Sequence, residues 1–295
     1  MGKDLFDQYP NSAKEVFDEV DEALGVSLQK IIFEGDQKTL TLTENAQPAI
    51  LATSIATLRV LQKEYGFDIN KACEYVLGHS LGEYTALVAS ESLPLSDAVK
   101  LVQLRGKAMS QAIQDRSNNK GKTGMLALVG RNGKLEDIEA SIQLLQKELP
   151  ANEVVEIANI NSTTQIVLSG TENGLNAASN YLKEKRMIAR AIPLEVSAPF
   201  HSSLVKSAEN TMKEAFEKVT FKQPRVHVIS NVTARPYKTI EEIPTTLIRQ
   251  ITSTVQWQQS IHFCKTQDVS DFVCFGPGTV LSGLLKKDYP ADIIR

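Results

Sequence analysis

The chain is poor in cysteine, and its cysteines lie far apart. Three of its 295 residues are cysteine, Cys73, Cys264 and Cys274, and no two of them form a C-x-x-C pair. An odd and sparse set of this kind predicts a reducing compartment, without a disulfide framework or a zinc ribbon. We expect the three cysteines to be small core residues.

Long hydrophobic runs and an excess of basic charge are also missing. There is no run of 18 apolar residues, and the first residues, Met1 to Phe6, lack the apolar stretch of a secretion signal. The formal net charge is -3, whereas a general nucleic-acid binder is usually basic. These absences predict a soluble protein with no membrane span and no nucleic-acid partner.

Helical and strand periods alternate along the chain, which predicts an α/β architecture. Ser12-Ala13-Lys14-Glu15 has the pattern of a capping box, and Gly25 is placed to end the helix that follows. A second long helix is expected over residues 49–64, with Pro48 in its first turn.

Residues 123–197 have a different rhythm from their surroundings. The pattern predicts strands at 125–129, 154–160, 165–168 and 191–196, and helices at 135–149 and 175–182. The order β-α-β-β-α-β is typical of ferredoxin-like modules. We therefore expect a ferredoxin-like subdomain at 123–197, inserted into an α/β core formed by residues 1–122 and 198–295.

The last third of the chain returns to the pattern of an α/β core. Residues 204–219 have helical spacing. Residues 226–229 and 271–275 are short apolar segments, as buried parallel strands tend to be.

A G-x-S-x-G motif lies between a predicted strand and a predicted helix. Residues 74–77 have strand character, Gly78-His79-Ser80-Leu81-Gly82 follows, and a helix continues from Glu83. In this setting the serine is expected on a sharp turn whose flanking glycine positions cannot carry bulk. The first amide N–H groups of the helix point at the serine, where an oxyanion would form. The context favours a nucleophilic Ser80 over a plain turn.

Ser80 needs a general base, because a hydroxyl is a weak nucleophile near neutral pH. Among four histidines, His201 is the preferred base, since it lies in a loop between a predicted strand and a predicted helix. His79 adjoins Ser80, and its side chain should diverge to shape the pocket. His227 is expected to be a packed or edge histidine on a strand, and His262 to lie on a helix face.

No aspartate or glutamate stands out by context as the third member of a triad. A backbone carbonyl could orient the base instead, because it too accepts a hydrogen bond from Nδ1. Arg105 is the other unusual residue, in a helix predicted over residues 96–113. Arginines on helices are usually solvated. Gly106 beside it costs about 1 kcal/mol relative to alanine, however, which suggests that another segment approaches closely.

Six motifs occur in order and at fitting distances along the chain. They are Gly78-His79-Ser80-Leu81-Gly82-Glu83-Tyr84, Arg105-Gly106-Lys107-Ala108-Met109, Asn159-Ile160-Asn161-Ser162, Ser197-Ala198-Pro199-Phe200-His201-Ser202, Val255-Gln256-Trp257 and Gly276-Pro277-Gly278-Thr279-Val280-Leu281. Together they resemble malonyl-CoA:acyl-carrier-protein transacylases, the loading enzymes of dissociated fatty acid synthesis, over nearly the whole chain. The resemblance implies a hydrolase-like α/β core with an inserted ferredoxin-like subdomain.

The resemblance also implies the chemistry. Ser80 would attack the malonyl thioester of malonyl-CoA, with His201 as general base, and the malonyl group would pass to the phosphopantetheine thiol of acyl carrier protein by ping-pong kinetics. The family orients its histidine with a backbone carbonyl, here that of Gln250. The Leu81 amide would donate to the oxyanion, and no cofactor is implied.

For the substrate, the resemblance implies that Arg105 holds the free malonyl carboxylate, because a planar guanidinium meets a carboxylate bidentately. Phe200 matches the malonyl-type form of its loop and should disfavour a branched methylmalonyl group. Asn161 and Gln47 align with polar residues that line the family's pocket.

The sequence departs from the family pattern at its start. Family members open with a strand that carries a Phe-Pro-Gly-Gln-Gly motif, whose glutamine supplies part of the oxyanion hole. This sequence starts at Met1-Gly2-Lys3-Asp4-Leu5, which corresponds to the stretch after that motif. Losing one oxyanion donor costs about 10²–10³ in rate. The resemblance therefore implies either a longer natural chain or an impaired enzyme.

Two other functions stay open. A serine esterase or thioesterase would share the serine turn and the fold, but it would usually have an acidic third residue and no use for Arg105. A truncated, inactive carrier-binding homologue is the second alternative, and intact Ser80, His201 and Arg105 argue against it.

The implied carrier partner is acidic, so a basic docking face is expected. Lys183, Lys185, Arg186 and Arg190 cluster near the end of the predicted subdomain and are the candidate docking residues; a solvated helix end is the alternative. The compartment would be the cytoplasm of a bacterium or the mitochondrial matrix of a eukaryote.

Overall fold

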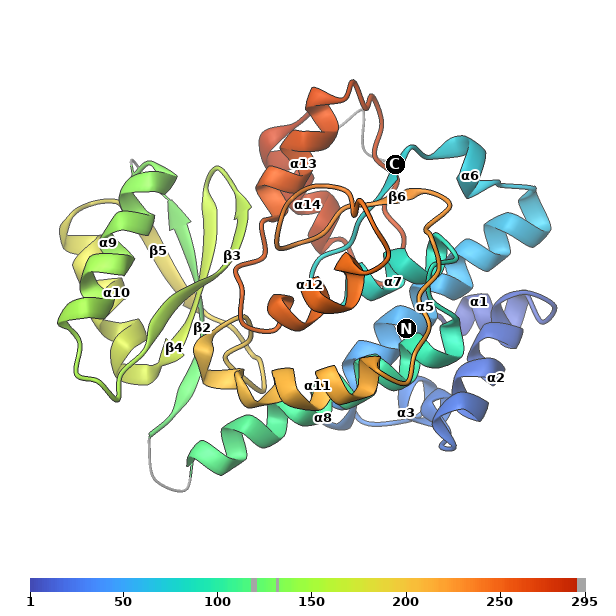
Figure 1. Cartoon of the computed structure of the whole chain (residues 1–295), viewed down its shortest axis with the longest axis horizontal. Helices are drawn as coiled ribbons and strands as arrows, with labels where there is room; N and C mark the ends of the chain where they lie inside the picture. Colours follow the sequence, from blue (N-terminus) through green and yellow to red (C-terminus); the bar gives the residue numbers. More distant parts are fainter. Residues whose placement is uncertain (118–120, 131–132, 291–295) are drawn as a thin grey trace.

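The computed structural model describes residues 1–117, 121–130 and 133–290. Figure 1 shows two parts side by side, a sheet with its helices at the left and a mainly helical body to the right. The sheet consists of residues from the middle of the chain, so the chain leaves the body, forms the sheet and returns. The fold is therefore α/β with an inserted module, as predicted.

The helical body comes from both ends of the chain. Before the sheet it contains α1 (Lys3–Gln8), α2 (Ala13–Leu24), α3 (Leu28–Phe33), α4 (Gln37–Thr41), α5 (Thr43–Tyr65), α6 (Ile69–Ala72), α7 (Gly82–Ala89) and α8 (Leu95–Ser117). After the sheet it contains the 3-10 helix η1 (Ser203–Val205), α11 (Ser207–Phe216), α12 (Glu242–Gln250), α13 (Trp257–Thr266) and α14 (Val280–Asp288). Inside it, β1 (Tyr75–Val76) pairs in parallel with β6 (His227–Val228). The largest hydrophobic cluster lies where α2, α5, α8 and α11 pack together.

The inserted module is an antiparallel sheet with its own hydrophobic cluster. Its strands are β2 (Thr123–Gly130), β3 (Val155–Ser162), β4 (Gln165–Thr171) and β5 (Ile188–Pro193), and its helices are α9 (Leu135–Glu148) and α10 (Glu172–Glu184). The strand order β3-β4-β2-β5 is that of a ferredoxin-like module. A separate apolar cluster extends from Leu126 to Ile188, entirely inside this stretch. The subdomain boundaries at 123 and 197 stay a prediction.

A backbone joint links the module to the body. Val255 donates from its amide to the Ala158 carbonyl at 2.8 Å, and its own carbonyl accepts from the Ile160 amide at 3.0 Å. The segment after α12 therefore lies along β3 as an added parallel bridge between Asn159 and Val255. This joint places the edge of the module next to the end of α12.

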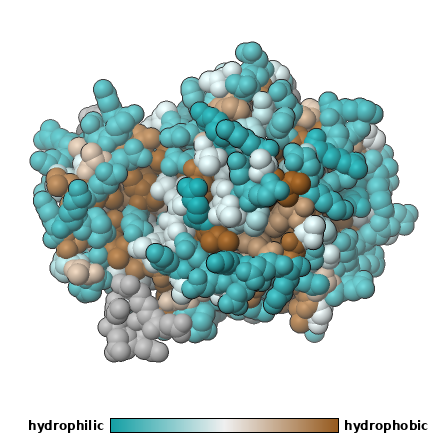
Figure 2. All heavy atoms as spheres, viewed as in Figure 1, coloured by the Kyte–Doolittle hydropathy of each residue, from teal (hydrophilic) through white to brown (hydrophobic). Residues whose placement is uncertain are grey.

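Hydropathy differs between the two parts of the molecular surface. On the face shown in Figure 2, hydrophilic residues cover most of the helical body, while hydrophobic residues gather over the side where the module lies and in a smaller patch near the middle. Exposed apolar residues of the module are Leu144, Ile192, Leu194 and Val196. The last three alternate along and just beyond β5, which is an edge strand.

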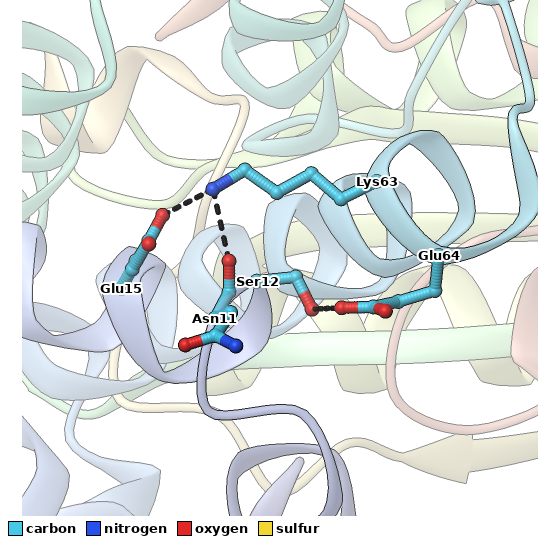
Figure 3. Close-up of polar contacts among 5 residues, drawn as sticks. All are labelled: Asn11, Ser12, Glu15, Lys63 and Glu64. Atoms are coloured by element: carbon cyan, nitrogen blue, oxygen red, sulfur yellow. Dashed lines mark hydrogen bonds and ion pairs between the residues drawn. The ribbon is translucent and has the colours of Figure 1, made fainter.

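Polar contacts fasten the start of α2 to the end of α5 (Figure 3). Ser12 makes no cap hydrogen bond; its hydroxyl donates instead to Glu64 at 2.8 Å. Lys63 donates to the carbonyl of Asn11 at 2.9 Å and pairs with Glu15. The predicted capping box is therefore wrong, because a tertiary partner on α5 takes the serine hydroxyl.

The long helix α5 begins earlier than its apolar spacing predicts. Pro48 was expected in the first turn, but α5 already begins at Thr43 and Pro48 lies inside it. The polar residues before Pro48 carry no helical apolar pattern. Thr43 and Gln47 are nevertheless buried, and Gln47 donates from its amide to the Thr43 hydroxyl at 2.8 Å. The extra turn brings Gln47 into the helix.

Three further predictions need correction. Residues 271–275 form a single bridge position at Phe272 and no strand, because a strand needs a ladder of hydrogen bonds to a neighbour. The helix expected over 204–219 is divided into η1 and the shorter α11. The last strand of the module is β5 at Ile188–Pro193, three residues earlier than predicted at its start, because it must pair with β2.

Candidate active site

The G-x-S-x-G motif forms a sharp turn between β1 and α7. Ser80 has a φ of 54°, in the left-handed region that side chains rarely adopt. A Cβ on Gly78 would lie 2.1 Å from the carbonyl oxygen of Gly82, so glycine is required there. A Cβ on Gly82 would meet nothing within 4 Å. The prediction that both flanking glycines exclude bulk is therefore correct only at Gly78, because Gly82 already starts the helix and faces open space.

Ser80 and His201 form a hydrogen-bonded pair. Ser80 Oγ lies 2.8 Å from His201 Nε2, and His201 Nδ1 lies 2.8 Å from the backbone oxygen of Gln250. A carbonyl only accepts, so Nδ1 carries the proton and Nε2 offers its lone pair to the serine hydroxyl. In the described part of the chain, no carboxylate hydrogen-bonds to this ring. A backbone carbonyl thus occupies the position that an aspartate has in a triad.

The module holds the loop that carries His201. The φ of His201 is 55°, again in the left-handed region. Two residues later, Ser203 donates from its amide and its hydroxyl to the two carboxylate oxygens of Glu156 on β3, both at 2.7 Å. Ser169 on β4 donates to the carbonyl of Phe200. Because these partners lie on paired strands, the loop is fixed to a rigid support.

Arg105 on α8 is buried beside the nucleophile, with 2% of its surface exposed. Its Nη1 donates to Gln47 Oε1 at 2.8 Å, and its Nη2 donates to Ser80 Oγ at 3.1 Å and to Gln250 Oε1 at 2.9 Å. The guanidinium carbon lies 5.9 Å from the ring centroid of Tyr84, and the buried Nε has no partner among the described residues. The site therefore contains a cation with donor capacity left over.

Gly106 lets α8 and α5 come together. A Cβ on Gly106 would lie 2.7 Å from the backbone nitrogen and Cα of Glu44 and 2.8 Å from the carbonyl carbon of Thr43. The close approach suspected from the sequence is therefore confirmed, and the approaching segment is the first turn of α5. It places Gln47 within reach of Arg105.

The electrostatics of the site keep His201 neutral. Burial, and after it the positive charge of Arg105, lower the pKa of His201 to about 3, although the Gln250 carbonyl favours the protonated form. Burial also lowers the pKa of Arg105 from its usual value, but an arginine keeps its charge in proteins. His201 is therefore ready to accept a proton at neutral pH.

Comparison with known proteins decides the family. The family described as "Acyl transferase domain" matches residues 1–269. A malonyl CoA-acyl carrier protein transacylase from Bacillus subtilis is 44% identical over 97% of this chain and 85% of the relative. The chain belongs to the malonyl-CoA:acyl-carrier-protein transacylase family.

Solved structures of this family superpose on most of the chain. An acyl-carrier-protein S-malonyltransferase from Bartonella henselae has a TM-score of 0.89 at 38% identity, covering 98% of this chain and 88% of that one. A complex of a type II polyketide acyl-carrier protein with its malonyl-transacylase has a TM-score of 0.88 at 32% identity, covering 100% of this chain and 89% of that one.

The remaining residues expected in the transacylase site lie around the pair. His79 Nε2 lies 2.9 Å from Asn161 Oδ1 on β3, and its ring packs 5.6 Å from that of Trp257. Phe200 is half-buried and packs against apolar clusters of both parts of the molecule. Leu81 caps α7, and its amide has no hydrogen bond among the described residues. The substrate and oxyanion roles of these residues stay predictions.

The two other histidines lie elsewhere. His227 on β6 and His262 on α13 are both exposed, and neither contacts Ser80. Within residues 1–117, 121–130 and 133–290, no group of three or more His, Cys, Asp and Glu could hold a metal ion. Within the same ranges, every helix is too short or too polar to cross a membrane.

Sequence reasoning missed a buried polar layer under the serine turn. Glu83 is fully buried on α7, and Asn231, one percent exposed, lies just after β6. Asn231 accepts from the Ser80 amide at 2.6 Å and donates to the Gly78 carbonyl at 2.7 Å. Two features of the sequence could have pointed to Glu83 and Asn231. Glu83 is the only charged residue of a helix that is otherwise apolar, apart from Tyr84 and Thr85, and Asn231 lies at the carboxyl end of a buried parallel strand, where α/β proteins place functional groups.

Proposed function

We propose that the chain transfers a malonyl group from CoA to the phosphopantetheine thiol of acyl carrier protein through an ester on Ser80. The observation that carries the proposal is the buried Arg105 guanidinium, 3.1 Å from the Ser80 oxygen. An acyl group esterified to Ser80 and ending in a carboxylate would put its negative charge beside this cation. The activities named for the relatives agree with this substrate.

In the first half-reaction, Ser80 Oγ attacks the thioester carbonyl while His201 Nε2 takes the hydroxyl proton. The carbonyl oxygen becomes an oxyanion and receives a hydrogen bond from the Leu81 amide. When the tetrahedral intermediate collapses, the C–S bond breaks and the CoA thiolate leaves with the proton from His201. Ser80 then carries the malonyl ester.

The second half-reaction reverses these steps. His201 takes the proton of the phosphopantetheine thiol, and the thiolate attacks the ester carbonyl. The bond between the acyl carbon and Ser80 Oγ breaks, and Ser80 Oγ regains its proton from His201. Because CoA leaves before the carrier reacts, the kinetics are ping-pong.

Selection for malonyl follows from charge and shape. Gln47 Oε1, Gln250 Oε1 and Ser80 Oγ accept hydrogen bonds from three of the five N–H donors of Arg105. A carboxylate exchanges neutral partners for an anionic one, which makes stronger hydrogen bonds. An acetyl group offers no such exchange, and Phe200 restricts room for a branched acyl group.

Intact-mass spectrometry after incubation with malonyl-CoA tests the proposal. The wild-type protein should gain one malonyl group, and Ser80→Ala should gain none. Arg105→Ala should lose the malonyl adduct but accept acetyl from acetyl-CoA. A wild-type protein that gains no adduct from malonyl-CoA contradicts the proposal.

An esterase would share the pair of Ser80 and His201 but use water as acceptor. The backbone carbonyl in place of a carboxylate and the buried Arg105 both favour the transferase. Incubating the malonylated protein with buffer or with holo carrier protein separates the two functions. The transferase should keep its adduct for much longer in buffer than with carrier, whereas an esterase loses it equally fast in both.

We also propose that Lys183, Lys185, Arg186 and Arg190 dock the acidic carrier. All four are exposed around the turn from α10 to β5. Charge reversal at Lys183 and Lys185 should raise the KM for carrier protein and leave acylation by malonyl-CoA unchanged. Charge reversal at Lys38 and Lys222, which are exposed elsewhere, is the matched control. Equal carrier kinetics in both double variants would contradict this docking site.

The cytoplasm is the proposed compartment. The relative named above comes from Bacillus subtilis, and all three cysteines of this chain are free thiols, which fits a reducing environment. Fractionation of the native source tests it, and recovery with organelles would contradict it.

A further inference from the structure

Glu83 is a buried carboxylate that the reaction steps above do not use. It is fully buried, one helical turn after the nucleophile. Its Oε2 accepts from the side-chain amide of Gln250 at 2.7 Å and from the backbone amide of Asn231 at 3.0 Å, while its Oε1 accepts from the Tyr237 hydroxyl. The two amide partners can only donate and the Tyr237 hydroxyl is placed to donate, so all three hydrogen bonds suit a carboxylate.

Gln250 is the partner that connects Glu83 to the reacting groups. Its backbone oxygen accepts from His201 Nδ1 at 2.8 Å. Its side-chain Oε1 accepts from Arg105 Nη2 at 2.9 Å, and its Nε2 donates to the Ser80 carbonyl at 3.1 Å as well as to Glu83. One residue thus touches the base, the cation and the backbone of the nucleophile.

The second partner, Asn231, acts on the turn itself. Its backbone amide donates to Glu83, while its side chain bridges the Ser80 amide and the Gly78 carbonyl. Ser80 is held in the left-handed region at a φ of 54°, a conformation that persists only where surrounding contacts enforce it.

Glu83 and Arg105 are opposite buried charges separated by one amide. The Gln250 side chain accepts from the cation with its oxygen and donates to the anion with its nitrogen. Both contacts fix the same orientation of the amide, because a flipped amide would set donor against donor and acceptor against acceptor. Burial raises the pKa of Glu83, while the hydrogen bonds from Tyr237, Gln250 and Asn231 lower it.

We propose that Glu83 is a positioning residue that sets the geometry of His201 and Arg105 through the side chain of Gln250. The proposal rests on the proposed acyl transfer for its biological meaning, but the geometry that it describes is measurable without an acyl-CoA. Loss of the carboxylate frees the Gln250 side chain, and the backbone carbonyl that orients His201 then moves with it.

Glu83→Gln is the direct test. The new amide oxygen can still accept from Gln250 and Asn231, and its NH₂ can donate to the Tyr237 hydroxyl, so the variant keeps the shape of the group but removes its negative charge and the stronger, charge-assisted hydrogen bond to Gln250. A fluorophosphonate that phosphonylates Ser80 reports the alignment of serine and base without any acyl substrate. We expect this reaction and malonylation both to slow by about 100-fold, because a shift of about 1 Å in a catalytic group has that effect.

Two matched variants separate positioning from a general loss of packing. Glu153→Gln makes the same chemical change at a glutamate of the module that accepts from Thr171, and it should leave Ser80 reactivity unchanged. Gln250→Leu keeps the backbone carbonyl and removes the side-chain bridge, so it should be as slow as Glu83→Gln. If Glu83→Gln does not fold, Gln250→Leu still tests the proposal, and wild-type reactivity in this variant would overturn it.

A double variant shows whether Glu83 acts through Gln250. If Glu83 acts through Gln250, then Glu83→Gln should slow Ser80 by less than about threefold in a Gln250→Leu background, since coupled residues are non-additive. A further 100-fold loss in that background would overturn the proposal. If wild type reacts with fluorophosphonate but not with malonyl-CoA, the proposed function fails, and the fluorophosphonate rates still decide the role of Glu83.

Discussion

The inserted module and the helical body bury different kinds of side chain. Between its sheet and helices the module buries an apolar cluster that includes Leu128, Leu168 and Leu182, and its strands pair through regular backbone ladders. The body buries an apolar core too, but around Ser80 it also buries Glu83 and Arg105. Its polar contacts join segments that are far apart in the chain.

This difference shows in which part of the molecule the identity of a buried side chain matters most. An apolar cluster tolerates many substitutions of similar volume, so the apolar core of the module can support the strands that hold the His201 loop without requiring particular core side chains. A buried charge tolerates few, because removing one partner leaves the other unpaired at a cost of about 3–5 kcal/mol. Substitutions of the buried charges in the body should therefore change reactivity, and those in the apolar cluster of the module should change stability alone.

Gly78→Ala should have the largest effect in the body. The new Cβ would lie 2.1 Å from the Gly82 carbonyl oxygen, so the serine turn cannot keep its shape, and Ser80 should not react with fluorophosphonate. Gly82→Ala is the control, because a Cβ there meets nothing within 4 Å. Equal reactivity in the two variants would show that the steric account of the turn is wrong.

Leu168→Ala tests the module side of the comparison. Leu168 is fully buried in the sheet, and removing its side chain should lower the free energy of unfolding by about 2–5 kcal/mol. The folded fraction should phosphonylate Ser80 at the wild-type rate, as measured well below the melting temperature. A variant that is slow although folded would mean that the module takes a more direct part in the site.

Gly106→Ala should have an intermediate effect on stability and on the rate of malonylation. The helices α8 and α5 must separate to admit a methyl group 2.7 Å from the Glu44 backbone. Overpacking of this kind costs about 1–3 kcal/mol, and malonylation should slow as Arg105 moves away from Gln47. In the module, Gly124→Ala is matched to it, since its Cβ would lie 3.9 Å from Leu175. Calorimetry and acylation rates of both variants make the comparison.

A change of pH should have the smallest effect on the reactivity of Ser80. The pKa of His201 is lowered by burial and by Arg105 to about 3, so the base stays neutral in mild acid and Ser80 phosphonylation should not fall between pH 8 and about pH 5. An unperturbed histidine would lose half of its rate near pH 6.5. Arg105→Ala removes a positive charge, which should raise the pKa of His201. The fall in rate at low pH should then begin at a higher pH than in wild type.

The same pKa affects stability in a defined direction. Unfolded His201 takes up a proton below about pH 6.5, whereas the folded protein binds it only near pH 3. The unfolded state therefore binds more protons in this window, and stability falls as the pH drops through it. Denaturant titrations at pH 7 and pH 5 should show a smaller loss for His201→Gln than for wild type, and an equal loss would contradict the assignment.

Local patterns in the sequence were enough to predict the module. Its strand and helix order follows from apolar periods within short windows, and the error at β5 arises because pairing with β2 decides where that strand begins. The turn around Ser80 and the close approach at Gly106 were also readable, since glycine spacing carries both. The end of α12 and the first turn of α5 were harder to predict, because polar residues there are buried by tertiary contacts.

The polar layer under the site could not be predicted in the same way. Glu83 lies on α7, whereas Asn231 and Tyr237 lie in the segment after β6, and nothing in either segment alone shows that their side chains meet Glu83. The side chain of Gln250 contacts three groups at once, whereas sequence reasoning named only its backbone carbonyl. Such contacts depend on the folded arrangement of the whole chain.

The rates of Ser80 acylation by malonyl-CoA and acetyl-CoA, measured by rapid quench and mass spectrometry, test the central claim most directly. Wild type should form the malonyl ester at least about 100-fold faster than the acetyl ester, because an acetyl group leaves the buried Arg105 without an anionic partner, and a buried charge without its partner costs about 3–5 kcal/mol. Arg105→Ala should lose this preference or reverse it. A preference for malonyl that survives in Arg105→Ala would contradict the account.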